Sequence, residues 1–142
     1  METWSRFFSG LVAAVAGFFA PISPLILSTV VFIGVDFLTG IAADRKEALA
    51  EQRTWYFESR KAWRTVLKLT MALTCIVLGW MMEHYILDFV TWRLARLFTG
   101  FICGVELWSF LENAAVLSDA PVFVALRRVA RRQLRGKLRG EK

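Results

Sequence analysis

Four apolar segments alternate with polar ones along the chain. A short segment covers residues 7–20, and longer ones cover residues 25–43, 63–82 and 90–117. A helix needs roughly 20 mostly apolar residues to cross a hydrocarbon core of about 30 Å. The three longer segments meet this length, and the pattern predicts an all-α integral membrane protein with three to four transmembrane helices.

The first segment is the ambiguous one. As a helix, its residues 7–20 extend over roughly 21 Å, which is short for a complete crossing. We therefore expect either a short spanning helix or a helix that lies in the membrane interface. Ser9, Ala13 and Gly17 repeat at every fourth position, a spacing that lets helix backbones approach closely in lipid.

Composition supports the membrane class. The chain has 142 residues, of which 56% are hydrophobic, and its mean hydropathy is +0.48. A single soluble domain of this size has too little interior to bury so much apolar surface.

The positive charge lies in a C-terminal tail. Of the 18 Lys/Arg and 12 Asp/Glu, residues 121–142 hold eight and one, which leaves ten and eleven in residues 1–120. We therefore divide the chain into a transmembrane domain, 1–120, and a basic tail, 121–142. The tail shows amphipathic helical spacing suited to anionic lipid headgroups, although a solvated tail fits its charge equally well. The candidate headgroup-binding residues are Arg127, Arg128, Arg131, Arg132 and Arg135. With Phe123 as its single aromatic residue and no recognition motif, the tail does not predict nucleic-acid binding.

Loop charges predict the orientation in the membrane. Residues 44–64 hold six Lys/Arg, whereas residues 83–89 hold none. Basic loops stay in the cytoplasm. We expect the 44–64 loop and the tail to be cytoplasmic and the 83–89 connection to be outside.

The second segment carries polar groups at membrane depth. Pro24 suits the first turn of a helix, and Ser23 is a possible N-cap. Asp36 is the single charge of residues 25–43 and shares a helix face with Thr39 and Gly40. Thr39 is placed to bond back to a backbone carbonyl, and Gly40 permits a close helix contact.

The fourth segment carries more polar groups. Glu106, Ser109 and Asn113 form one stripe, and Glu112 lies beside it. Gly100 and Gly104 form a G-x-x-x-G step that favours a helix crossing.

Ionisable groups inside a membrane usually face protein or water. One reading is that Lys68, Arg64 or Asn113 pairs with Asp36 and Glu106 inside the molecule. The other is that the acids line a water-filled lumen or bridge subunits. Lys68 and Arg64, near the start of the third segment, are also placed to snorkel to the headgroups.

No catalytic constellation is present in the sequence. Cys75 and Cys103 lie in apolar segments, where we expect buried thiols, and His84 is the single histidine. We expect neither an enzyme, nor a metal site, nor a cofactor.

Three motifs resemble one family. D-F-L-T-G at 36–40 resembles the D-x-x-T-G motif of phage holins, a family that also includes holin-like toxin-secretion proteins. S-R-K at 59–61 and V-L-K at 66–68 resemble the basic loop of these holins. V-E-L-W-S-F-L-E-N-A-A at 105–115 resembles their E-L-x-S-I-x-E-N signature.

The resemblance implies a multi-pass protein of the bacterial inner membrane that forms homo-oligomers and permeabilises the membrane during phage lysis. An endolysin would then reach the cell wall without needing direct contact with this chain. Two alternatives stay open: a non-conducting scaffold or anchor whose basic tail binds lipid or a soluble partner, and a small dedicated channel or transporter subunit.

Overall fold

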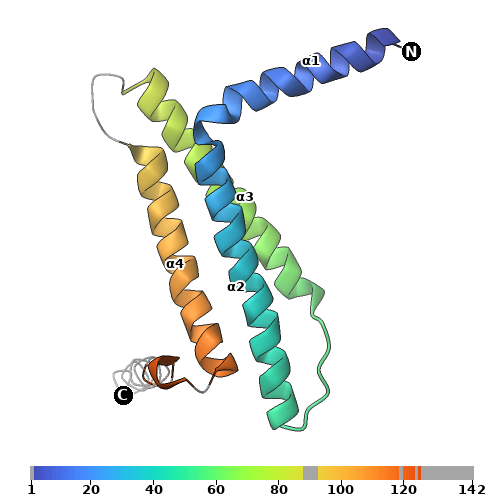
Figure 1. Ribbon diagram of the computed structural model, residues 1–142, viewed down its shortest axis with the longest axis vertical. Helices are drawn as coiled ribbons and strands as arrows, with labels where there is room; N and C mark the ends of the chain where they lie inside the picture. The colour runs from blue at the N-terminus through green and yellow to red at the C-terminus, as the bar shows by residue number, and fades with distance from the viewer. Residues whose placement is uncertain (1, 88–92, 119, 124, 126–142) are drawn as a thin grey trace.

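The structure, a computed structural model, describes residues 2–87, 93–118, 120–123 and 125. All secondary structure in these ranges is helical, as the sequence predicts (Figure 1). The elements are α1 (Glu2–Phe19), the short 3-10 turn η1 (Ala20–Ile22), α2 (Ser23–Ala50), α3 (Ser59–Tyr85) and α4 (Leu94–Leu117). The predicted headgroup-binding arginines, from Arg127 to Arg135, lie outside the described residues.

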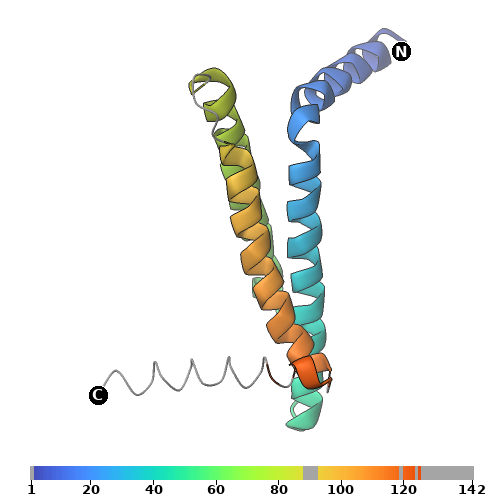
Figure 2. The ribbon, with the colours of Figure 1, turned by 60° about the vertical axis from the view of Figure 1, so that its left-hand side comes forward.

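Helices α2, α3 and α4 form a three-helix bundle (Figures 1 and 2). Helices α2 and α4 run in the same direction, α3 runs against both, and the α2–α4 contact is the most extensive. We call the end that carries residues 51–58 the loop end, and the end where α3 leads into α4 the connection end. Helix α1 leaves the bundle at the connection end and turns away from it in both views.

Three helical stretches are long and apolar enough to cross a membrane. They are Trp4–Ala50, Ser59–Tyr85 and Leu94–Leu117. The first has 47 residues, or roughly 70 Å of helix, far more than one crossing requires. The chain bends at η1, which divides this stretch into α1 and α2, and α2 alone is long enough for one crossing.

Two prolines set the bend before α2. Pro21 and Pro24 lack the N–H groups that would continue the helical hydrogen bonds. Pro24 occupies the first turn of α2 as predicted, but the prediction that Ser23 caps the helix is wrong. Ile22 is the N-cap residue, and Ser23 Oγ instead donates a hydrogen bond to the carbonyl of Ala20, at 2.9 Å.

The packed core is small and lies near the connection end. It consists of Ile22, Ile76, Trp80 and Ala95. Nearby, Gly79 lets α3 and α4 approach closely, because a Cβ at this position would come within 2.8 Å of the Phe98 ring. Most other large apolar side chains point outward, an arrangement that suits lipid as the surrounding medium.

The two cysteines differ in environment. Cys103 is half-buried, whereas Cys75 is exposed on the outer face of α3. The expectation of a buried thiol is therefore wrong for Cys75. A thiol on the outer face of a membrane helix is still in an apolar environment, because acyl chains surround it.

Candidate functional site

Asp36 lies at the middle of α2 and points into the bundle. Its side chain is 12% exposed. Thr39, one turn later, donates its hydroxyl proton to the backbone carbonyls of Val35 and Asp36, at 2.8 and 3.0 Å. This is the backward bond that the sequence predicts, and it leaves the Asp36 carboxylate available to the other helices.

Lys68 of α3 joins the two intramembrane acids. Its Nζ lies 3.2 Å from Asp36 Oδ2 and 2.7 Å from Glu106 Oε2. The Glu106 side chain, on α4, is 4% exposed, while that of Lys68 is 42% exposed. Lys68 therefore has its charge partners on the other two helices of the bundle. Two carboxylates at the same depth hold its ammonium group between the three helices.

Asn113 adds a second link between α2 and α4. Its Nδ2 donates to Asp36 Oδ1 at 3.1 Å and approaches the Asp36 carbonyl at 3.4 Å. Gly40 lies beside this amide, and a Cβ there would be in contact with Asn113 Nδ2 at 3.4 Å. The D-x-x-T-G and E-N motifs thus meet in space.

We call Asp36, Lys68, Glu106 and Asn113 the charge cluster. Among the described residues, every buried side-chain nitrogen and oxygen has a hydrogen-bond partner. Charges in a low-dielectric interior are tolerated when paired and hydrogen-bonded, and removing one partner costs about 3–5 kcal/mol. With its groups ionised, the cluster holds two negative charges against one positive charge. In the single chain, Asp36 and Glu106 therefore have partners inside the molecule, as the first of the two readings expects.

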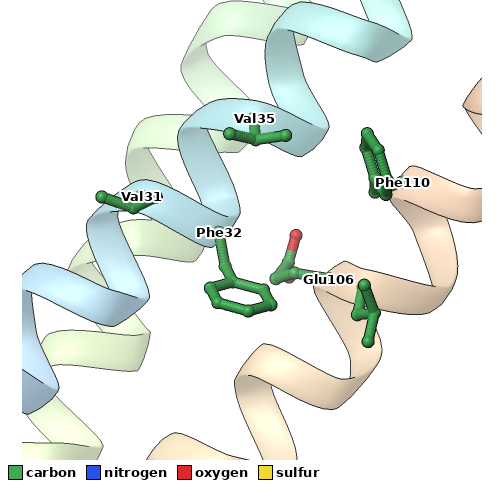
Figure 3. A pocket seen from close by; sticks show the side chains of 6 residues that line it. Val31, Phe32, Val35, Glu106 and Phe110 are labelled. Carbon is green, nitrogen blue, oxygen red and sulfur yellow. The ribbon is translucent and has the colours of Figure 1, made fainter.

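An apolar pocket lies beside Glu106 (Figure 3). It has a volume of about 160 Å³ and lies between α2 and α4. Its lining is apolar apart from the glutamate and comprises Val31, Phe32, Val35, Glu106, Leu107 and Phe110. Glu106 thus both pairs with Lys68 and borders an apolar hollow.

The other predicted site residues of α4 lie outside the cluster. Ser109 is half-buried. Glu112 is exposed and accepts a hydrogen bond from Trp108 Nε1 at 2.9 Å. Gly100 and Gly104 are exposed, and a Cβ at either position would meet nothing within 4 Å. The predicted crossing at this glycine pair is therefore not made within the single chain.

Asp44 organises the loop end of the bundle. Its carboxylate accepts hydrogen bonds from Arg53 at 2.8 Å, Lys61 at 3.0 Å and Trp55 at 3.1 Å. The hydrogen bond that Arg53 donates to the Asp44 carboxylate raises the pKa of the exposed Arg53 guanidinium. Lys46 also reaches the Leu117 carbonyl at 3.2 Å, which ties the end of α4 to α2.

At the connection end, Glu83 of α3 accepts a hydrogen bond from the backbone N–H of Ala95, at 3.2 Å. It thereby caps one of the free N–H groups in the first turn of α4.

The roles of Gly79, Glu83 and Asp44 were not predicted from the sequence. Gly79 stands between bulky apolar neighbours in a membrane helix, which is a usable signal for close packing. Glu83 and Asp44 gave no such signal, since their partners lie on other helices or in an irregular loop.

The described residues include no group of three or more His, Cys, Asp or Glu side chains that could hold a metal ion. The cluster instead offers paired charges and amide hydrogen bonds, which serve helix association inside a membrane.

The sequence model of the bacteriophage holin family matches residues 13–132. The match includes all of α2, α3 and α4 and the whole charge cluster. Neither the curated proteins nor the solved structures contain a match to the chain. The family match covers most of the sequence, and three helical stretches are able to cross a membrane. The chain therefore belongs to the bacteriophage holin family and is a holin-like, multi-pass membrane protein.

Proposed function

We propose that this chain oligomerises in the cytoplasmic membrane of a bacterial host and permeabilises it, so that an endolysin reaches the cell wall during phage lysis. The loop end and the basic tail face the cytoplasm, and the connection end faces outward. The basic 44–64 segment and the lack of Lys/Arg in residues 83–89 support this orientation.

The observation that carries the proposal is the charge cluster. Asp36, Lys68 and Glu106 are costly to place at the middle of a membrane bundle, and apolar residues would serve a passive anchor better. In a single chain the groups satisfy one another. In an assembly, the same groups are available to pair across subunits or to face water.

Passage of a folded enzyme requires many copies of the chain. The bundle of α2, α3 and α4 is packed around its own side chains, and the pocket beside Glu106 holds about 160 Å³. Such a hollow accommodates one acyl chain segment or side chain. A lesion must therefore form between chains.

The glycine pair of α4 offers a surface for that association. Gly100 and Gly104 lie one turn apart on an exposed face, with open space above both. Two such faces can bring helix backbones close together in lipid.

Induced expression in bacteria tests the function directly. We expect an abrupt, nonselective collapse of the membrane potential, followed by lysis only when an endolysin is co-expressed. An intact potential at high levels of inserted protein would contradict permeabilisation and favour a scaffold. A steady and ion-selective current would favour a dedicated channel.

Substitution of the glycine pair tests the association. Gly100→Leu with Gly104→Leu should shift the distribution of cross-linked oligomers toward smaller species. Gly34→Leu is the matched control, because Gly34 of α2 also has open space around its Cβ position. An unchanged distribution in the double variant would remove the glycine pair from the interface.

A further inference from the structure

Helix α1 separates its side chains by size. At about 100° per residue, all its large apolar side chains fall within one arc of less than half the circumference. From Trp4 onward, the remaining arc carries Ser5, Arg6, Ser9 and only Gly or Ala residues besides. The large side chains are Trp4, Phe7, Phe8, Leu11, Val12, Val15, Phe18 and Phe19.

The large-residue arc faces the bundle where α1 ends. The Phe18 ring meets the Trp80 ring edge-to-face with centroids 5.1 Å apart, and Phe19 packs against the core. Farther along α1, the large side chains have no protein against them: Trp4 is 71% exposed and Leu11 is 51% exposed. The large-residue arc therefore contacts the bundle at the end of α1 and, farther along the helix, faces the medium that surrounds the bundle.

The turn before α2 bends the chain without reversing it. Phe19 has φ −88° and ψ −3°, Ile22 has φ −108° and ψ 1°, and Ser23 has φ −55° and ψ −38°. None of the three is extended or left-handed, the conformations that would let α1 fold back along α2 as a helical hairpin. In both views α1 instead leaves sideways (Figures 1 and 2).

The exit point lies among side chains typical of a membrane interface. Trp80 stacks on His84 at 5.6 Å, and His84 meets Tyr85 at 4.9 Å. Aromatic side chains with a polar edge concentrate at the depth of the headgroups. Residues 1–22 carry one Lys/Arg, Arg6, against six in residues 44–64, so the positive charge that favours the cytoplasmic side lies at the other end of the bundle.

We propose that α1 lies in the plane of the membrane, in the interface at the connection end. Its large-residue arc contacts the acyl chains of that leaflet, and its small-residue arc faces the headgroups and water. The partner of this surface is the lipid of the same membrane that the bundle crosses. With roughly 27 Å of helix along the surface, α1 then occupies area in one leaflet only.

In the proposed orientation the connection end faces outward, which assigns α1 to the outer leaflet. This assignment rests on the proposed orientation, whereas the in-plane position does not. The protein therefore crosses the membrane three times, and its N-terminus lies on the same side as the connection end.

Spin-label depth measurements test the in-plane position. The full chain, with Cys75→Ala and Cys103→Ala, is reconstituted in vesicles of phosphatidylethanolamine and phosphatidylglycerol. Single cysteines then carry a nitroxide at Phe8, Leu11 and Val15 on one arc, and at Ser9, Ala13 and Ala16 on the other. The expected result is a depth that oscillates with the helical period, with oxygen contact several-fold higher on the large-residue arc.

Two outcomes would overturn the proposal. A depth that changes steadily from Phe8 to Ala16 would mean that α1 crosses the membrane. High contact with a water-soluble nickel reagent at all six positions would mean that α1 lies in water. Both readouts concern inserted protein and are independent of lesion formation.

A pair of charge variants supplies a second readout. Leu11→Asp should raise the nickel-reagent contact of a nitroxide at Val15 several-fold, because it places a carboxylate among acyl chains. Ala13→Asp is the matched control on the other arc and should leave that contact unchanged. Equal effects of the two variants would contradict the assigned arcs.

Labelling in whole cells with a membrane-impermeant maleimide tests the leaflet. Ala13→Cys should react from outside the cell, and Gln52→Cys, in the loop, should react only after the cytoplasm is opened. The reverse pattern would overturn the outer-leaflet assignment and the proposed orientation together, while leaving the in-plane position standing.

Discussion

The middle of the bundle and its connection end are held together by different forces. At the connection end, Ile22, Ile76 and Trp80 pack by shape, with Gly79 against Phe98. At the middle, Lys68 holds two carboxylates and an amide completes the contact. Apolar helix contacts in lipid lose little free energy when another helix replaces the original neighbour, because acyl chains and side chains are equally apolar.

A charge cluster behaves differently. Its groups must find polar partners or water at every stage of a rearrangement, because an unpaired charge at this depth is costly. In the single chain these groups pair with one another. The proposed permeabilisation requires that water or another chain replace those partners. The apolar packing of the connection end has no such requirement.

The largest effect should come from removing the cation. Lys68→Met leaves Asp36 and Glu106 facing each other without a counter-charge. Because Lys68 is partly exposed, we expect a loss near the low end of the usual range, about 3 kcal/mol of bundle stability. Denaturation of the detergent-solubilised protein by sodium dodecyl sulfate measures this loss.

Two further variants sharpen that result. Lys61→Met removes an exposed cation at the loop end and should cost less than about 1 kcal/mol. Lys68→Met combined with Asp36→Asn and Glu106→Gln should recover most of the stability, because no unpaired charge remains. Failure of the triple variant to recover would mean that Lys68 acts through its packing and not through its charge.

The next effect should come from the connection end. Gly79→Ala places a Cβ 2.8 Å from the Phe98 ring and 3.3 Å from the Ala95 nitrogen, so the helices must separate. We expect a loss of about 1–3 kcal/mol in the same denaturation assay. Gly34→Ala, with open space around it, should be neutral or slightly stabilising. Equal results for the two glycines would contradict the close α3–α4 contact.

The middle of the bundle and its connection end also differ in how far the sequence predicts them. The polar character of Asp36, Thr39, Glu106 and Asn113 was visible, because charged and amide groups stand out in apolar segments. Which of Lys68, Arg64 or Asn113 pairs with them was not visible, since it depends on the rotation of each helix about its axis. Small core contacts such as Gly79 against Phe98 depend on the same rotations.

Helix ends show the same limit. The fourth segment was predicted to end at residue 117, where α4 does end. Helix α2 continues seven residues past the predicted apolar limit at residue 43, to Ala50, because its polar extension keeps helical hydrogen bonds outside the apolar region. The apolar pattern therefore locates the membrane-crossing part of a helix better than the helix itself.

A smaller effect should come from the loop end. Asp44→Asn removes the charge that Arg53 and Lys61 share, and we expect a loss of less than about 1 kcal/mol that shrinks further in high salt. The denaturation assay at two salt concentrations measures it. A loss as large as that of Lys68→Met would mean that the loop, and not the middle of the bundle, controls its stability.

The central claim is that the polar stripe of α4 (Glu106, Ser109 and Asn113), which is buried or half-buried in the single chain, faces water once the membrane opens. Ser109→Cys, in a chain with Cys75→Ala and Cys103→Ala, reports on this stripe through reaction with a charged, water-soluble thiol reagent. Met71→Cys, on the lipid-exposed face of α3, is the control and should stay unreactive throughout. The account predicts that Ser109→Cys is unreactive before the membrane potential collapses and reacts promptly afterwards; a potential that collapses while Ser109→Cys stays unreactive would contradict it.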